Sequence, residues 1–324
     1  MTRTKVGVLR GGPNTEFEVS LETGKSVLEN MPSDRYEGLD IFIDREGEWH
    51  VRGKPVKPVD ALRGVDVVFN AMHGPYGEDG IVQKLLDKFN IPYNGSGALA
   101  SAVSMNKLLA KQRAEAIGMQ TPQYVILEVS PNLEQTLSDI FRTFPQPTVV
   151  KPISCGSSVG VTIAHGYKNL IQGVERAFEH CPKVIVEEYI PGREATVGVI
   201  EDFRDQEIYA LPPIEIIPPT NKDFFDYDAK YGGESQEICP GNFDKEVTGQ
   251  LENLAREIHK HLDLRHYSRS DFRISPKGIY FLEVNTLPGL TEGSLLPKAV
   301  SAVGSSQSEF IDHVISLALT PTRT

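Results

Sequence analysis

The sequence predicts a mixed α/β protein, in which an open parallel sheet is followed by a small α+β unit and a strand-rich C-terminal part. Three observations lead to this prediction. Strands, glycine-rich loops and helices alternate at the N-terminus, which is typical of a parallel sheet. Short strands with single helices follow, and strands then dominate from Pro191 onward. We therefore place domains at residues 1–100, 101–190 and 191–324.

The first 100 residues supply the elements of the parallel sheet. Strands are expected at residues 5–9, 65–71 and 91–93, and helices at about 18–29 and 81–89. Ligands of open parallel sheets bind at the carboxyl ends of the strands. The glycine-rich loops at 11–12 and 73–80 both follow strands, so we expect both loops to open onto that edge.

A different pattern begins near residue 101. Ser104 could N-cap a helix that runs to about residue 117, and Gly118 would end that helix. Further elements are expected as strands at 148–152, 161–164, 184–190, 196–200, 207–211, 270–274 and 279–284, and as helices at 169–179 and 245–262. The polar segment at about 218–240 is long for a loop in a compact domain, which indicates a lid.

Composition narrows the class of protein. The net charge of −11 and the pI near 5.3 argue against non-specific nucleic-acid binding and against docking on anionic membranes. The three cysteines have no metal-binding or disulfide spacing. The chain enters a strand at its N-terminus without a signal-peptide pattern, and no apolar run could span a bilayer. We therefore expect a cytoplasmic protein.

Two short strands near the C-terminus form a predicted hairpin around residues 276–278. A three-residue loop starting with proline and ending with glycine suits this turn. That register places Asp271 directly opposite Glu283, and Asn285 shares the same face. Carboxylate and amide oxygens with this arrangement suit Mg²⁺. The alternative from this stretch alone is a hairpin whose polar face meets only solvent.

Other motifs suggest contacts with a nucleotide. Lys151 ends a strand before the small-residue loop 152–160, whose amides could approach phosphate oxygens, although a plain turn would have a similar composition. Glu187 and Glu188 end another strand, whose edge could bind adenine, or they could be a surface acidic pair. The G-x-G-x-x-A match at 95–100 lacks a suitably placed acidic residue and does not indicate NAD binding.

Together, these motifs resemble the D-alanine–D-alanine ligase family of the ATP-grasp superfamily. The resemblance covers nearly the whole chain and rests on the segments at 11–20, 73–80, 93–97, 104–107, 151–160, 227–231, 269–271, 283–291 and 294–295. It implies the ATP-grasp fold, with an N-terminal domain and two α+β domains that clamp ATP. The lid position Tyr231 implies a dipeptide product, since relatives that form depsipeptides carry His there.

The family resemblance also implies roles for individual residues. Those at the ATP site would be Lys107, Lys151, Ser157, Ser158, Glu187, Glu188, Ile190, Glu194 and Lys230. Those binding two Mg²⁺ ions, or Mn²⁺ in their place, would be Asp271, Glu283 and Asn285. Those at the D-alanine sites would be Glu16, His73, Arg269, Ser294 and Leu295. Those taking part in catalysis would be Glu16, Ser157, Tyr231, Arg269 and Gly289.

The activity implied is ATP-dependent formation of D-alanyl-D-alanine through a D-alanyl phosphate, for peptidoglycan precursor synthesis. The resemblance also implies a homodimer. Two alternatives stay open at this point. A related ATP-grasp enzyme could join a carboxylate to a different amine or hydroxyl, which product analysis would reveal. A non-catalytic nucleotide-binding protein could use the same scaffold, although the complete set of predicted metal and phosphate ligands argues against it.

Overall fold

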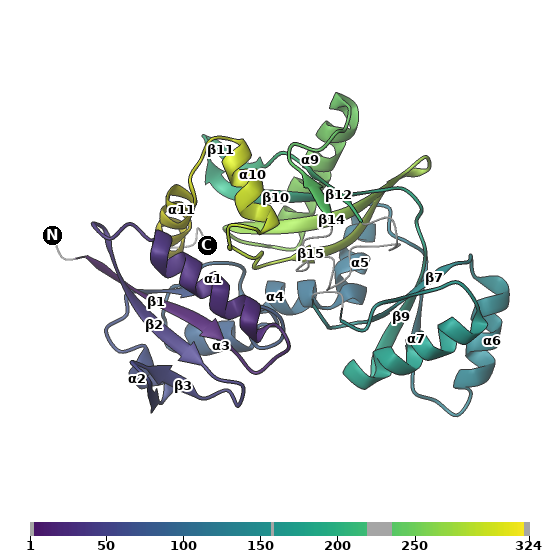
Figure 1. Cartoon of the computed structure of the whole chain (residues 1–324), viewed down its shortest axis with the longest axis horizontal. Coiled ribbons are helices and arrows are strands. Elements are labelled where there is room, and N and C mark those ends of the chain that lie inside the picture. The colour runs from purple at the N-terminus through teal and green to yellow at the C-terminus, as the bar shows by residue number, and fades with distance from the viewer. Residues whose placement is uncertain (1–2, 157–158, 219–234, 321–324) are drawn as a thin grey trace.

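A computed structural model describes residues 3–156, 159–218 and 235–320 of the chain. Three separate sheets organise it, and Figure 1 shows them in three parts of the molecule, with the N-terminal and central parts at opposite ends. Each sheet combines with its own helices, so the molecule is of the mixed α/β class that the sequence predicts. None of the described helices has the length and apolar character needed to cross a membrane.

The N-terminal sheet has the strand order β4-β3-β2-β1-β5. Its strands are β1 (Thr4–Gly11), β2 (Tyr36–Ile43), β3 (Trp49–Val51), β4 (Lys54–Val56) and β5 (Val67–Asn70). Its helices are α1 (Phe17–Asn30), α2 (Pro58–Ala61) and α3 (Ile81–Lys88). The pairs of β1 with β2 and β5 are parallel, as predicted, but β3 and β4 add an antiparallel hairpin at one edge. Residues 91–93 contribute only a single bridge at Tyr93, so a full strand there was wrongly predicted.

The central sheet is antiparallel, with the order β6-β9-β7-β8. Its strands are β6 (Tyr124–Glu128), β7 (Thr148–Pro152), β8 (Thr162–Ala164) and β9 (Lys183–Glu188). Its helices are α6 (Leu133–Thr143) and α7 (Tyr167–His180), which pack against each other and over the sheet. These elements enclose a hydrophobic core of their own, around Val150, Leu170 and Val186.

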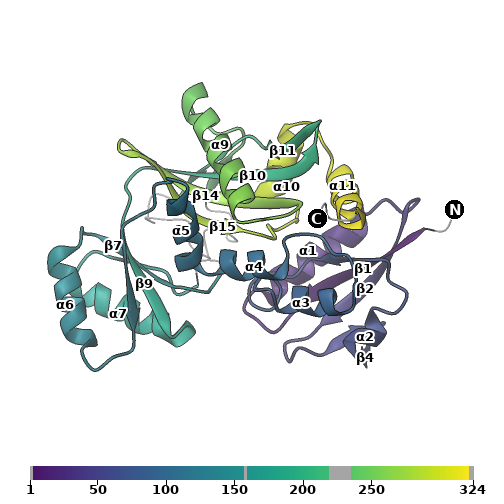
Figure 2. The ribbon, with the colours of Figure 1, turned by 180° about the vertical axis from the view of Figure 1, so that it is seen from behind.

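Two helices, α4 (Ala98–Met105) and α5 (Lys107–Ala116), connect the N-terminal and central parts (Figure 2). The sequence predicted a single helix capped by Ser104, but Ser104 lies inside α4. Asn106 breaks the run with an extended backbone, and its side chain accepts a hydrogen bond from the amide of Leu109. Asn is a strong N-cap residue, and this cap starts a new helix at Lys107.

The C-terminal sheet has the order β13-β12-β10-β14-β15, and β11 also pairs with β10. Its strands are β10 (Arg193–Phe203), β11 (Gln206–Ala210), β12 (Ile214–Ile217), β13 (Gln236–Ile238), β14 (Tyr267–Ser275) and β15 (Gly278–Asn285). Its helices are α9 (Lys245–His261), α10 (Leu295–Ala302) and α11 (Gln307–Leu319). Helix α9 packs on β10, β11 and β14 through Leu251, Ala255 and Ile258, which recur at helical spacing.

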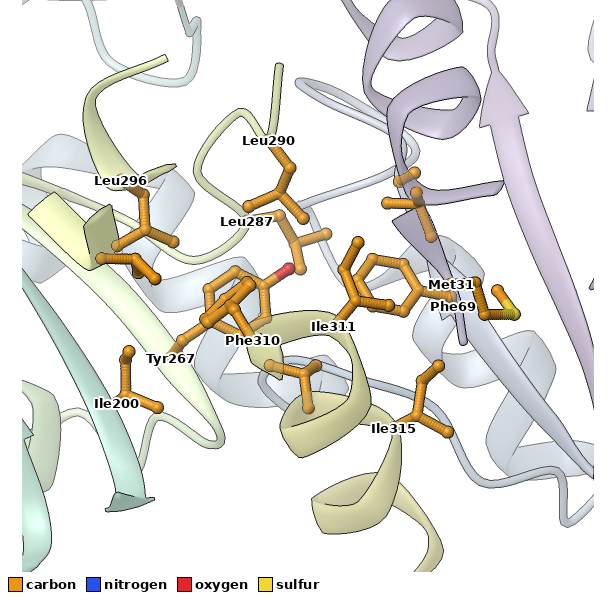
Figure 3. Close-up of a cluster of buried hydrophobic side chains, with 14 of the residues drawn as sticks. Met31, Phe69, Ile200, Tyr267, Leu287, Leu290, Leu296, Phe310, Ile311 and Ile315 are labelled. Atoms are coloured by element: carbon orange, nitrogen blue, oxygen red, sulfur yellow. The ribbon is translucent and has the colours of Figure 1, made fainter. Parts of the chain in front are cut away.

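One hydrophobic core joins the N-terminal and C-terminal parts. Figure 3 shows Met31 and Phe69 from the N-terminal part beside Ile311 of α11, with Phe310 and Tyr267 on the other side of that helix. All of these side chains are buried. The shared core fixes these two parts against each other, whereas the central sheet has its separate core.

Candidate active site

The β14–β15 hairpin pairs Asp271 with Glu283 and Arg269 with Asn285, which confirms the predicted register. The route to that register differs from the prediction. Ser275 pairs with Gly278, so the loop has two residues rather than three. A bulge opposite Asp271 and Phe272 inserts one extra residue into β15 and restores the pairing. As a result, Leu282 and Glu283 both line the same small cavity.

The three candidate metal ligands already have polar partners on the protein. Asp271 accepts hydrogen bonds at 3.0 and 3.1 Å from Nε and Nη2 of Arg269, and one of 2.5 Å from Thr196 Oγ1. The carboxylate of Glu283 lies 3.0 Å from Lys107 Nζ. Asn285 Oδ1 accepts from the amide of Leu287 at 3.0 Å. Positive charge and N–H donors therefore hold these oxygens in place beside the hairpin.

A cavity of about 90 Å³ lies between the central and C-terminal sheets. Its apolar lining comes from Val149, Ile163 and Leu282, and its charged lining includes Lys107 and Lys151. A flat aromatic base suits apolar walls, while lysines suit phosphates. The sequence-based prediction missed Leu282, because only the bulge turns it toward this cavity. It also missed Arg273, which lines the same cavity.

The residues at the end of β9 and directly after it form one edge of this cavity. Glu188 is tied to the chain before β6, since its amide and its carboxylate bond with Gln123 at 2.9 and 3.0 Å. Among the described residues, the Ile190 amide donates to no main-chain carbonyl. It could therefore donate to a base. Glu194 pairs with Arg273 at 3.1 Å on the same rim.

Glu187 is buried at the back of the small cavity, between two lysines. Its Oε2 lies 2.8 Å from Lys151 Nζ, and its Oε1 lies 3.0 Å from Lys111 Nζ. Burial opposes ionisation, but the two ammonium groups outweigh it and lower the pKa of Glu187. The carboxylate therefore anchors lysines in this structure, and its contact with adenine stays a prediction. Sequence reasoning missed Lys111, although it lies one helical turn after Lys107.

A second cavity, of about 520 Å³, adjoins the first, and Lys107 and Glu283 line both. Several predicted substrate and catalytic residues line this larger cavity. They are Glu16, His73, Arg269, Gly289, Ser294 and Leu295. Asn285 also lines it, so the candidate metal ligands lie at the boundary of the two cavities. Lys107 is held there by the carbonyl of Cys155 at 2.7 Å and by Glu283.

Glu16 lies where the N-terminal and central parts meet. Its Oε1 would be 2.8 Å from a Cβ added to Gly74 and 2.3 Å from one added to Gly156. Only glycine therefore allows both backbones to approach this carboxylate. Sequence analysis had marked the glycine-rich loop at 73–80 but not its Glu78, which also lines the larger cavity.

Glu78 bridges two parts of the chain. Its two oxygens accept from the amides of Gly74 and Leu287, at 2.6 and 3.2 Å. Complete burial and the nearby Glu16 carboxylate outweigh these bonds and raise the pKa of Glu78 to about 8.

His73 is buried beside the same cavity, and its Nε2 lies 2.8 Å from Thr23 Oγ1. Burial lowers the pKa of His73 to about 4, against a bond to the Leu287 backbone that raises it, and Arg269 lowers it further. The imidazole is therefore neutral near pH 7 and supplies hydrogen bonds rather than charge.

The far side of the larger cavity is formed by the start of α10. Ser294 is the N-cap of that helix, and its Oγ lies 2.7 Å from Thr291 Oγ1. The first amides of a helix favour anions, so a carboxylate is suited to this end of the cavity. A Cβ at Gly289 would come within 2.9 Å of Ser294 Oγ, so the backbone at Gly289 approaches this side chain closely.

Four predicted site residues, Ser157, Ser158, Lys230 and Tyr231, lie outside the described residues. The same holds for most of the predicted lid at 218–240. Their roles remain predictions from the family resemblance.

Comparison with known protein families identifies two matching family models, which together cover most of the chain. Residues 5–62 and 53–96 match the family model described as the D-ala D-ala ligase N-terminus, and residues 114–316 match the one described as the D-ala D-ala ligase C-terminus. A D-alanine--D-alanine ligase of Syntrophotalea carbinolica is 37% identical over 317 residues, covering 98% of this chain and 96% of the relative. A D-alanine--D-alanine ligase of Halalkalibacterium halodurans is 38% identical, covering 97% and 99%.

A solved structure is also closely similar. VanG D-Ala:D-Ser ligase from Enterococcus faecalis superposes with a TM-score of 0.85 at 31% identity, over 98% of this chain and all of that one.

Proposed function

Because the chain belongs to the D-alanine–D-alanine ligase family, we propose that it joins two D-alanine molecules into D-alanyl-D-alanine for peptidoglycan precursor synthesis, converting ATP to ADP and phosphate. One observation carries the proposal furthest. The small cavity suits a nucleotide, the larger one suits amino-acid substrates, and both are lined by Lys107 and Glu283. The terminal phosphate of a bound nucleotide would therefore face a substrate carboxylate.

The proposed reaction has two chemical steps. A carboxylate oxygen of the first D-alanine forms a bond to the γ-phosphorus of ATP, and the bond from that phosphorus to the β,γ-bridging oxygen breaks, which releases ADP. The amine of the second D-alanine then attacks the acyl carbon and loses a proton. The acyl carbon–oxygen bond breaks, and inorganic phosphate leaves with the peptide bond formed.

Lys107 and Lys151 offset the charge of the phosphates in the first step. Burial would lower the pKa of Lys107, but the nearby Glu283 carboxylate outweighs it and raises that pKa, so Lys107 stays charged. Lys151 also lines the small cavity. Ammonium groups placed in advance stabilise a transferring phosphoryl group without reorganising solvent.

The donor set at the cavity boundary fits a hard divalent cation. Asp271, Glu283 and Asn285 offer carboxylate and amide oxygens, which Mg²⁺ prefers. Arg269 and Thr196 hold Asp271, Lys107 holds Glu283, and the Leu287 amide holds Asn285. These three residues would hold two Mg²⁺ ions, or Mn²⁺ in their place. When bound, the cation would neutralise phosphate charge and orient the phosphoryl group.

The larger cavity orients both amino acids. Glu16 supplies a carboxylate for the ammonium group of the first D-alanine, and neutral His73 supplies a hydrogen bond. Ser294 and Leu295 would receive the carboxylate of the second D-alanine at the start of α10. Arg269 and the backbone of Gly289 line the same space and would stabilise the oxyanion that forms on attack of the amine.

An acyl phosphate reacts readily with water, so the cavity must be closed during turnover. The segment at 218–240 is proposed to supply that closure, with Tyr231 linked to Glu16 and Ser157. The finer assignments, including the domain boundaries, a homodimeric state and a cytoplasmic location, form part of the same proposal.

The proposal is tested by ADP release from purified protein with Mg²⁺ and ATP. D-alanine should stimulate ADP release, L-alanine should not, and D-alanyl-D-alanine should accumulate in equal amount to ADP. Mixtures of D-alanine with D-serine or D-lactate separate this activity from that of related ligases, since D-alanyl-D-alanine should dominate. ADP release that is indifferent to D-alanine would refute the proposal.

A further inference from the structure

A buried lysine without an assigned role lies beneath the nucleotide cavity. Lys111 is in α5, one turn after Lys107, and its side chain is fully buried. It lines neither the small nor the large cavity, so it cannot contact a ligand there directly. Its Nζ lies 3.0 Å from Glu187 Oε1. Among the described residues, Glu187 is the one carboxylate within ion-pair distance of this ammonium group.

The carboxylate of Glu187 is shared between two lysines with different surroundings. Oε1 faces Lys111, whereas Oε2 faces Lys151 at 2.8 Å. Lys151 lines the nucleotide cavity and retains some exposure, at 13% for its side chain, but Glu187 is only 1% exposed. A single buried negative charge therefore has one counter-ion inside the protein and another that can reach a ligand.

We propose that Lys111 is a positioning residue for nucleotide binding: it is the permanent counter-ion of Glu187, and it thereby allows Lys151 to leave that carboxylate for a phosphate of ATP. This inference rests on the proposed function, because it assumes that the small cavity binds ATP. Lys151 would exchange one anionic partner for another, while Lys111 would stay in place.

The physical reason is the cost of an unpaired buried charge. Removing the counter-ion from a desolvated carboxylate is strongly unfavourable. With Lys111 present, Glu187 keeps a partner after Lys151 has moved. Without Lys111, Lys151 would be the only ammonium group paired with Glu187 in the described part of the chain, so its transfer to a phosphate would leave a buried anion alone. ATP binding should then weaken even though every residue that touches ATP is intact.

If the role of Lys111 were purely structural, its substitution should have different effects. The ion pair joins α5 to β9, so Lys111 could act only as a link between those elements. Loss of such a link would weaken the binding of both ATP and D-alanine and would lower the stability of the folded state. It would not be repaired by neutralising Glu187.

The test compares Lys111→Met with the wild type, and the double variant Lys111→Met/Glu187→Gln with Glu187→Gln alone. Binding of Mg-ATP is measured by titration calorimetry without D-alanine, and steady-state constants are measured separately. Lys111→Met should weaken ATP binding about tenfold or more, corresponding to about 1.4 kcal/mol. The KM for D-alanine and kcat at saturating ATP should stay within about threefold, less than half that energy. The double variant should bind ATP about as tightly as Glu187→Gln alone, because a buried carboxamide needs no counter-ion. Comparing these two variants removes any contribution that Glu187 itself makes to adenine binding.

Lys183→Met is the matched control, because Lys183 lies on the same strand as Glu187 but is exposed and pairs with Glu128. Its ATP affinity should equal that of the wild type. The inference is overturned if folded Lys111→Met binds ATP normally, or if the folded double variant binds ATP more weakly than Glu187→Gln. Should Lys111→Met fail to fold, the second comparison decides: equal ATP affinity of the double variant and Glu187→Gln supports the inference, and weaker binding by the double variant overturns it. Failure of the wild type to bind ATP would instead refute the proposed function.

Discussion

At the scale of single residues, the candidate metal ligands Asp271 and Glu283 face each other across the hairpin and are held by polar partners. Alternation along two strands was enough to predict their opposition. Thr196 and Arg269 hold Asp271, and Lys107 holds Glu283; Thr196 and Lys107 come from segments distant in the chain. Contacts of this kind depend on the tertiary fold, which local pattern does not specify.

Glu283→Gln tests the role of the shared residue between the two cavities. The amide keeps the size of the side chain but removes the charge that faces Lys107 and would face the cation. We expect kcat/KM for ATP to fall at least about 100-fold, with a higher Mg²⁺ requirement, since ligand and supporting groups both affect metal affinity. Activity is measured across a Mg²⁺ titration. Glu128→Gln, on the exposed surface, is the control, and an unchanged Mg²⁺ dependence in Glu283→Gln would contradict the role.

At the scale of elements, the predicted register of the β14–β15 hairpin is correct, although the predicted length of its turn is wrong. The two-residue loop alone would shift Asp271 away from Glu283 by one position, and the bulge corrects the shift. Turn length and bulges are both set by backbone geometry, and Pro276 and Gly278 allowed either loop length. The break at Asn106 was missed for a similar reason, because Ser104 is an equally good cap by type.

Gly278→Ala is predicted to destabilise the hairpin. Gly278 has φ of +134°, and an added Cβ would lie 2.3 Å from Gln120 Oε1. We expect a loss of about 1–3 kcal/mol in the free energy of unfolding, measured by urea denaturation. Gly249→Ala, in α9, is the matched comparison, since nothing lies within 4 Å of its added Cβ. That variant should gain up to about 1 kcal/mol from helix propensity. Equal effects of the two substitutions would contradict the argument.

At the scale of the whole molecule, the site depends on packing that joins separate parts. The shared core fixes the N-terminal and C-terminal parts against each other, and the larger cavity is lined by residues of both. The central sheet, with its own core, contributes one wall of the small cavity. The resemblance to a family predicted many of the charged and polar residues that line the two cavities. It did not predict Glu78, Lys111 or Leu282, whose importance comes from burial and from a bulge rather than from a motif.

Acid should destabilise the whole molecule below about pH 6.5. Burial lowers the pKa of His73 and of His266 to about 4, so each binds a proton on unfolding between pH 6.5 and 4. Glu78, with its pKa raised to about 8, opposes this by releasing a proton on unfolding above pH 4.5. Between pH 4.5 and 6.5 the net uptake is about one proton, so stability should fall by about 1.4 kcal/mol per pH unit on acidification.

Above pH 6.5 the sign reverses, because of these three groups only Glu78 still differs in protonation between the folded and unfolded states, and its stabilisation is lost as pH rises through about 8. Urea denaturation from pH 4.5 to 8 measures both limbs. Glu78→Gln should steepen the acid limb to about 2.7 kcal/mol per pH unit and abolish the decline above pH 6.5. A variant that keeps the wild-type profile would show that Glu78 does not titrate in this way.

The central claim is that the two cavities bring a substrate carboxylate to the terminal phosphate of ATP beside Lys107 and Glu283. Transfer of oxygen tests it most directly, because the carboxylate oxygen that attacks phosphorus must leave with the phosphate. D-alanine labelled with oxygen-18 in its carboxylate is turned over with unlabelled ATP, and the released phosphate is analysed by mass spectrometry. The account predicts one labelled oxygen in each phosphate. Phosphate without label, formed while D-alanyl-D-alanine accumulates, would contradict it.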